Sequence, residues 1–161
     1  MRPEDKPVFL RLEDWQLMGL CIEREAGGES REGQIAVGTV ILERVDYRDW
    51  DGTTIKQVIL KPWQFSWTMP EAGEYYYEKS VAIAVDFKEQ YEYGRNISLV
   101  RCCGIATGLI NGLMPRDADL VRFHCCQYLN PVIAHKTRTK WLASGMRSIK
   151  IIGRHEFFAD R

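Results

Sequence analysis

A carboxylate in the apolar stripe of the first long predicted helix is the feature that most constrains how this chain can fold. Over residues 13–28, Met18, Cys21 and Ile22 recur at the three- and four-residue spacing of a buried helix face. Glu25 continues that face, because it follows Met18 by seven residues and Cys21 by four. A fold that buries this face must therefore accept a carboxyl group in its interior or in a cleft that borders it.

Two glycines predict where on the helix this carboxyl group lies. Gly27 and Gly28 indicate the helix end, since glycine readily adopts the left-handed conformation that terminates many helices. Burial disfavours the charged form of a carboxylic acid and raises its pKa, so a glutamic acid placed here can keep a proton to donate near neutral pH. Glu25 is therefore a candidate catalytic acid. An ordinary helix-end ion pair with an arginine is the alternative.

Length and composition predict one domain. The chain of 161 residues, with 45% apolar and 27% charged side chains, is long enough for one hydrophobic core and has no proline- or serine-rich linker. Residues 1–14 carry charges and prolines in place of the apolar centre of a signal peptide, and no apolar run reaches the length of a membrane span. We expect a single domain over residues 1–161, made without Sec-type export and without stable membrane insertion.

Charge patterning argues against a nucleic-acid partner. The 22 basic and 22 acidic side chains cancel, so no net charge attracts a polyanion. Between Val132 and His155 there is no acid, and Trp141 alone interrupts the basic run with a large aromatic ring. That pattern favours a solvated basic face over a nucleic-acid site. The basic residues of this run are Lys136, Arg138, Lys140, Arg147, Lys150 and Arg154.

The cysteine pattern predicts reduced thiols. Cys21 stands alone, while Cys102 and Cys103, and Cys125 and Cys126, are adjacent, which does not fit a disulfide framework. Several of these residues are expected to act as small apolar core residues. A zinc site that joins His124 and His135 to the second cysteine pair is a weaker alternative, because neither half has the paired ligand spacing of structural zinc sites. We expect no metal and no cofactor.

Periodicity and turn residues predict a mainly helical α+β fold with a small antiparallel β subdomain near the C-terminus. Ser30 is the expected N-cap of a central helix over residues 31–44 that is apolar on nearly all sides, and a turn is expected at Asp49–Gly52. A cleft between the helical and β parts would place Glu25 opposite residues 63–67 and the sheet. Further helices are predicted over 54–60, 74–91 and 97–113, and strands over 121–129, 148–152 and 156–158.

Aromatic and polar side chains alternate over residues 63–67. Trp63, Phe65 and Trp67 are separated by Gln64 and Ser66, which predicts an extended segment with rings on one side and hydrogen-bonding groups on the other. Sugars bind such surfaces, because their ring faces stack on aromatic side chains while amides and hydroxyls satisfy their polar edges. Three rings in a hydrophobic core are the alternative interpretation.

Four motifs follow one another along the chain. The first covers Glu25–Glu29 and Glu32–Leu42 with Arg44, and the second is Gln64-Phe65-Ser66. The third joins Tyr128 to Asn130-Pro131, and the fourth joins Trp141 to residues 152–158. Together they span residues 12–158 and resemble, in the same order, the motifs of the SleB/CwlJ-type cell wall hydrolase family.

The resemblance implies a lysozyme-like fold. It also implies an enzyme that cleaves the glycan strands of peptidoglycan without a cofactor, with Glu25 as the catalytic acid. The SleB-like core would cover about residues 12–158, with no separate wall-binding domain. Substrate contacts are then expected from Glu29, Gln64, Phe65, Ser66, Trp67, Tyr128, Asn130 and His155.

Many members of this family are lytic transglycosylases, which need one acid. Glu25 would protonate the oxygen that joins N-acetylmuramic acid to N-acetylglucosamine, and as a carboxylate it would then assist attack of the muramyl C6 hydroxyl on C1. A hydrolytic muramidase would instead need a second acid at roughly 5 to 9.5 Å; Glu29 and Glu32 are the nearest in sequence. We favour the single-acid mechanism. Hydrolysis, a non-catalytic peptidoglycan-binding module and a zinc-dependent regulator are the alternatives.

Two departures from the family pattern concern the later motifs. The family commonly has asparagine at the position of Glu43, and a tryptophan closely follows its proline, whereas Trp141 comes after the extra stretch Val132–Lys140. This insert supplies much of the basic run, which either contacts anionic peptidoglycan or keeps a loop soluble.

The expected biological setting is that of a phage endolysin. A monomer with reduced thiols would wait in the host cytoplasm and reach the periplasmic peptidoglycan of a Gram-negative host through a membrane lesion made by a holin. Its partner would be the glycan strand, with no nucleic acid bound.

Overall fold

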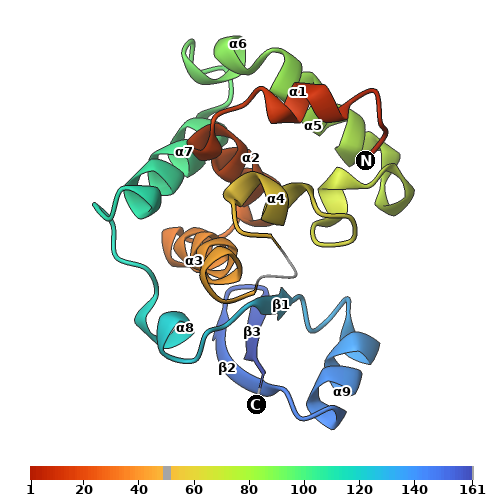
Figure 1. Ribbon diagram of the computed structural model, residues 1–161, viewed down its shortest axis with the longest axis vertical. Coiled ribbons are helices and arrows are strands. Elements are labelled where there is room, and N and C mark those ends of the chain that lie inside the picture. The colour runs from red at the N-terminus through yellow and green to blue at the C-terminus, as the bar shows by residue number, and fades with distance from the viewer. Residues whose placement is uncertain (49–51, 161) are drawn as a thin grey trace.

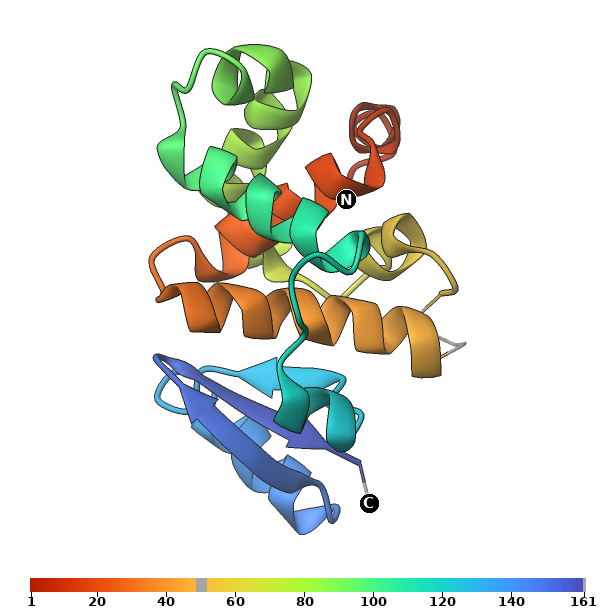
Figure 2. The ribbon, with the colours of Figure 1, turned by 90° about the vertical axis from the view of Figure 1, so that its left-hand side faces the viewer.

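The computed structural model describes residues 1–48 and 52–160. Figures 1 and 2 show a helical part and a three-stranded sheet on opposite sides of one central helix, α3. The predicted α+β fold, mainly helical with a late antiparallel sheet, is confirmed. In chain order the elements are α1 (Lys6–Leu10), α2 (Asp14–Ala26), α3 (Arg31–Tyr47), α4 (Ile55–Leu60), the 3-10 turns Ser66–Thr68 and Pro70–Ala72, α5 (Glu74–Val85), α6 (Phe87–Tyr91), α7 (Ile97–Ile110), α8 (Ala118–Arg122), β1 (Gln127–Leu129), α9 (His135–Ala143), β2 (Arg147–Ile152) and β3 (His155–Ala159).

Helix α2 begins at a capping box and packs closely on α7. The Glu13 backbone N–H donates to the Gln16 side chain at 2.8 Å, and the Glu13 side chain accepts in return from the Gln16 backbone. Gly19 permits the close contact with α7, because a Cβ atom there would lie 2.8 Å from the Cα atom of Cys103. The predicted apolar face of α2, including Met18, is fully buried.

Helix α3 forms the wall shared by the two parts of the molecule. The Ser30 hydroxyl accepts a hydrogen bond from the Gly33 backbone N–H at 3.3 Å, which confirms the predicted N-cap. Val37 belongs to the hydrophobic cluster shared with α2 and α7, whereas Val40 belongs to the cluster shared with the sheet. Figure 2 shows α3 crossing the middle of the molecule, with α2 and α7 on one side and the sheet on the other.

The sheet has the strand order β1-β3-β2, and both pairs are antiparallel. Tyr128 on β1 lies opposite Phe157 on β3. The Phe157 side chain is fully buried. Gly153, in the turn between β2 and β3, has φ +55°, and a Cβ atom there would lie 2.0 Å from Oε2 of Glu29. The sheet therefore meets the α2–α3 corner at a position where only glycine fits.

Two predicted elements are wrong in extent. The helix predicted over 74–91 is two helices, because the backbone leaves the helical region at Asp86 (φ −109°, ψ 33°) and lets Phe87 pack on Trp15 at 6.1 Å between ring centroids. The strand predicted over 121–129 begins as helix α8, since the Asp117 carboxylate accepts hydrogen bonds from the Asp119 and Leu120 backbones. Of the predicted strand, only residues 127–129 pair with β3.

Besides α8, two helices were not predicted. Helix α1 buries Phe9 against Trp67 at 5.8 Å, and helix α9 lies mostly within the insert, which is therefore an ordered helix and not an extended loop. The turn expected at Asp49–Gly52 falls largely on residues 49–51, outside the described residues. None of the described helices is long and apolar enough to cross a membrane.

Candidate active site

Helix α2 ends beside a cleft and carries Glu25 in its last turn. The helix stops at Gly27, as predicted, but with φ −58° and ψ −30°, so the expected left-handed cap is wrong. The cleft has a volume of about 650 Å³ and separates the α2, α3 and 63–69 side from the β1 and α9 side. Its lining includes Glu25, Arg44, Trp63, Gln64, Ser66, Met69, Gln127, Tyr128, Leu129, Asn130, Ile133, Ala134, Thr137 and Trp141.

The Glu25 carboxyl group is half-buried and bonded to the sheet. The Tyr128 hydroxyl donates a hydrogen bond to Oε2 of Glu25 at 3.0 Å. Burial raises the pKa of Glu25 from 4.5 to about 7, against the opposing effects of the Tyr128 hydrogen bond and the Arg44 charge. The group therefore holds a proton near neutral pH and has two neighbours that stabilise its carboxylate form.

Arg44 is a site residue that sequence reasoning did not select. Its side chain is 3% exposed; Nε donates to the Cys126 carbonyl at 2.7 Å, and the guanidinium lies 5.1 Å from the Phe65 ring centroid. Nη1 is buried without a hydrogen-bond partner among the described residues. Arg44 follows Ile41 by three residues and so lies on a buried stripe of α3. An arginine on such an apolar stripe was the sequence signal that could have identified it as a site residue, because a buried charge needs polar partners.

The aromatic segment is bent, so the predicted extended conformation is wrong. Trp63 has φ +68° and is 74% exposed at the edge of the cleft, whereas Phe65 and Trp67 are buried in the core. Gln64 and Ser66 line the cleft, as their alternation with the rings predicted. Two of the three rings thus follow the core interpretation, and the polar side of the segment faces the site.

The insert builds the opposite wall of the cleft. The Asn130 side chain accepts hydrogen bonds from the backbones of Val132 at 3.0 Å and Ile133 at 3.3 Å, which orders the turn before α9. Trp141 of α9 lines the cleft and packs edge to face on Phe158 at 5.3 Å. Neither α9 nor a site role for Trp141 was predicted.

Glu29 and His155 lie behind the cleft wall rather than in its lining. Oε1 of Glu29 accepts from Nε of Arg154 at 2.5 Å, and this bond holds the pKa of Glu29 below its usual value. His155 is buried edge-on to the Tyr128 ring at 5.1 Å, and burial lowers its pKa, so the imidazole is neutral at pH 7. His155 thus packs against a residue of the cleft wall, and contact of Glu29 and His155 with substrate remains a prediction.

Glu25 is the only carboxylic acid among the described residues that line the cleft. Glu32, the other nearby acid, is 62% exposed and pairs with Lys150 at 3.3 Å. Glu43, the departure from the family pattern, is fully buried on another side of α3 with Arg116 at 3.0 Å and His124 at 3.3 Å. Neither Glu32 nor Glu43 is among the residues that line the cleft.

Three of the six basic side chains in the basic run are paired with acids. Arg138 pairs with Glu156 at 2.6 Å, Lys150 pairs with Asp117 at 2.9 Å, and Arg154 is held by Glu29. Lys136 and Lys140 on α9 are solvent-exposed. The run therefore presents much less free positive charge than its sequence indicates.

The environment of the cysteines argues against zinc ligation. All five thiols are buried and free, as predicted for small core residues. Burial raises the pKa of Cys125 to about 12 and that of Cys126 to about 11. Among the described residues, no three His, Cys, Asp or Glu side chains lie together in a group that could hold a metal ion.

Fold and cleft together define an α+β domain with one proton-holding acid at the end of a buried helix. The chain belongs to the cell wall hydrolase family, whose model matches residues 28–158. The crystal structure of the catalytic domain of the Bacillus cereus SleB protein is similar, with a TM-score of 0.53 and 26% identity, over 90% of this chain and 88% of that chain. A comparison with curated protein sequences found no match.

Proposed function

We propose that this protein cleaves the β-1,4 bond between N-acetylmuramic acid and N-acetylglucosamine in peptidoglycan, as a lytic transglycosylase. The observation that carries the proposal is a single acid, Glu25, with a pKa of about 7 in a cleft whose described lining holds no other carboxylic acid. A retaining or inverting hydrolase generally needs a second carboxylate across the scissile bond. Intramolecular attack by a substrate hydroxyl does not.

In the first step the protonated Glu25 acts as a general acid. It gives its proton to the glycosidic oxygen, and the bond from that oxygen to C1 of the muramyl residue breaks. N-acetylglucosamine leaves with a new hydroxyl group. Positive charge develops at C1, beside a carboxylate that has just become negative.

In the second step the same carboxylate acts as a general base. It accepts the proton of the muramyl C6 hydroxyl as O6 bonds to C1, which leaves a 1,6-anhydro end and restores the protonated acid. The Tyr128 hydroxyl at 3.0 Å and the charge of Arg44 stabilise the carboxylate between the two steps. Each turnover therefore needs neither water nor a cofactor.

Lysis and product analysis test this function. Purified protein should lower the turbidity of permeabilised Gram-negative cells, and Glu25→Gln should abolish that activity while leaving folding and wall binding intact. Glu32→Gln is the matched control, because Glu32 is exposed and lies outside the cleft lining. Retained lysis by Glu25→Gln would remove Glu25 from the mechanism, and inactive wild type that still binds the wall would favour a binding module.

Mass spectrometry of the released fragments separates the two chemistries. Anhydro-muropeptides are expected for transglycosylation. Reducing ends at muramic acid would instead identify a hydrolytic muramidase, which would have to activate water in the same cleft with Glu25 alone or with a group outside the described residues.

We further propose that the protein acts as a phage endolysin, held in the host cytoplasm until a holin opens the membrane. Five buried thiols, four of them in adjacent pairs and none in a disulfide, fit synthesis in a reducing compartment. Expression in a Gram-negative host should cause lysis only when a holin is co-expressed. Lysis without the holin, or an active enzyme that causes none with it, would contradict this role.

A further inference from the structure

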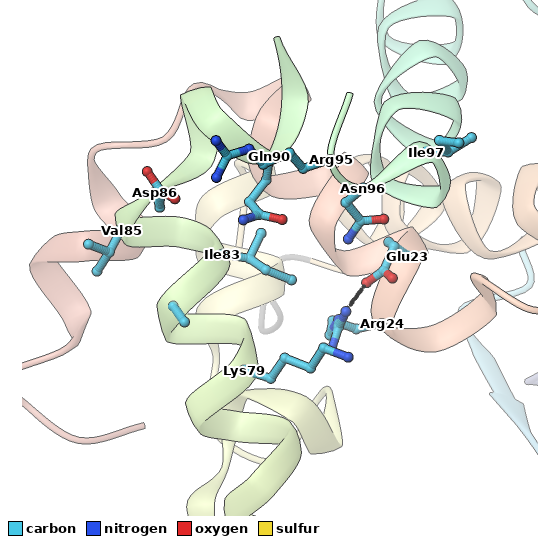
Figure 3. A pocket seen from close by; sticks show the side chains of 11 residues that line it. Glu23, Arg24, Lys79, Ile83, Val85, Asp86, Gln90, Arg95, Asn96 and Ile97 are labelled. Carbon is cyan, nitrogen blue, oxygen red and sulfur yellow. Dashed lines mark hydrogen bonds and ion pairs between the residues drawn. The ribbon is translucent and has the colours of Figure 1, made fainter. Parts of the chain in front are cut away.

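A second pocket lies next to the C-terminal end of α2, on the other side of this helix from the cleft. It has a volume of about 770 Å³ and lies between α2, α5, α6 and the segment that precedes α7. Figure 3 shows its walls: Glu23 and Arg24 from α2 face Lys79 and Ile83 of α5, and Gln90 and Asn96 border it from a third side. The mechanism above uses none of these side chains.

A smaller hollow shares lining residues with both this pocket and the cleft. The hollow has a volume of about 280 Å³ and shares Ser66 with the cleft and Arg24 with the second pocket. Arg24 directly precedes Glu25 on α2, so the three hollows surround one helix end. A ligand held at Glu25 would therefore have to pass over Ser66 and Arg24 to reach the second pocket.

The chemistry of the walls changes along this path. Trp63, Tyr128 and Trp141 line the cleft, and Trp67 and Tyr76 line the smaller hollow. No aromatic side chain is among the described residues that line the second pocket, where charged and amide side chains take their place. Sugar rings bind aromatic faces, whereas charged groups bind charged and amide partners. The second pocket thus suits a charged, non-saccharide part of the substrate.

The lining of the second pocket contains both positively and negatively charged side chains, and an ion pair holds part of it in place. Arg24 pairs with Glu23, and both side chains are largely buried, which fixes this wall. Lys79 is exposed, and Figure 3 shows its side chain extending toward Arg24. Asp86 places a carboxylate at the opposite end of α5. A ligand that carries carboxylates and an ammonium group matches this arrangement better than a purely anionic or a neutral one.

We propose that this pocket binds the peptide stem that branches from the muramyl residue, and so selects stem-bearing glycan over bare glycan. The inference rests on the proposed glycan cleavage. The stem is a short peptide with free carboxylates and, in Gram-negative walls, an amino group on its third residue. Lys79 binds a stem carboxylate, Asp86 binds the ammonium group, and the amides of Gln90 and Asn96 bind the peptide backbone.

Two substrates of the same glycan backbone test the proposal. Wild-type protein should cleave stem-bearing strands with a higher kcat/KM than strands stripped of their stems by an amidase. Lys79→Gln should lower kcat/KM roughly two- to fivefold on stem-bearing strands, as expected for loss of an exposed ion pair, and leave cleavage of bare strands unchanged. Lys88→Gln is the matched control, since Lys88 is an exposed lysine on α6 that pairs with Glu92 and does not line the pocket.

Direct binding separates failure of this proposal from failure of the proposed function. The isolated tetrapeptide stem, titrated by NMR into isotope-labelled protein, should shift amide signals of residues 79–96, and Lys79→Gln should weaken that binding. Peptide binding with no cleavage of either strand would overturn the proposed function and keep the pocket. Equal cleavage of both strands by the wild type, or equal effects of the two lysine variants, would overturn the stem pocket.

Discussion

Replacement of Glu25 by glutamine should stabilise the protein, in a pH-dependent way, while it abolishes activity. In the folded protein the pKa of Glu25 is about 7, against an ordinary value of 4.5. Between these two pH values the folded state binds more protons than the unfolded state, so the free energy of unfolding of the wild type falls as pH rises. Glutamine cannot ionise and does not have this loss.

The size of the effect follows from the pKa rise. At about 1.4 kcal/mol per pKa unit, complete ionisation in the fold costs at most about 3.5 kcal/mol. Because Glu25 is only half-buried and solvent screens part of its charge, we expect about 1 to 2 kcal/mol. The stability difference between Glu25→Gln and wild type should grow by this amount from pH 4.5 to pH 7 and stay constant above about pH 7.5.

Urea unfolding followed by tryptophan fluorescence measures this difference across pH 4 to 8. Glu29→Gln is an internal control of opposite sign. Arg154 holds the pKa of Glu29 below its usual value, so the stabilisation from Glu29 is present at pH 8 and is lost as pH falls through its folded pKa. A difference between Glu25→Gln and wild type that is the same at pH 4 and pH 8 would refute the claim that Glu25 is held protonated by burial.

Three further substitutions test the site and its frame. Tyr128→Phe removes a hydrogen bond that lowers the pKa of Glu25, so the alkaline limb of the kcat/KM pH profile should move to higher pH and kcat should fall; a shift to lower pH would contradict the assignment. Trp141→Ala should raise KM severalfold with little change in kcat, measured on solubilised glycan strands, because it removes a sugar-stacking ring from the cleft wall. Gly19→Ala should destabilise the fold by about 1 to 3 kcal/mol in urea unfolding, since its Cβ atom would lie 2.8 Å from the Cys103 Cα atom, whereas Gly104→Ala, with no atom within 4 Å, should not destabilise it.

Local signals predicted the part of the site that lies on α2 and the start of α3. The three- and four-residue apolar spacing placed Glu25 on a buried face, and Ser30 marked the start of the next helix. Both signals act within one or two helical turns, so the sequence contains everything that fixes them.

The rest of the site depends on contacts between distant segments. Residues 121–125 have an apolar pattern compatible with a strand, but the N-cap at Asp117 starts a helix that runs into this segment. Only residues 127–129 pair with the sheet. Helix α9 has a weak apolar face, and the structure holds it through Trp141 on Phe158 and Arg138 on Glu156. Neither contact is visible in a window of the length used to predict a helix.

The pairing of Tyr128 with Glu25 shows how register completes the chemistry. The two residues are 103 positions apart, and they meet because β1 pairs with β3 so that Tyr128 lies opposite Phe157. A shift of one residue would turn the Tyr128 side chain to the other face of the sheet and leave the Glu25 carboxylate without its hydroxyl donor. The turn at Gly153, which receives Glu29 where a Cβ atom would collide, fixes the β2–β3 hairpin against the α2–α3 corner. The acid is thus encoded locally in α2, whereas the groups that stabilise its conjugate base are supplied by the sheet and by Arg44 of α3.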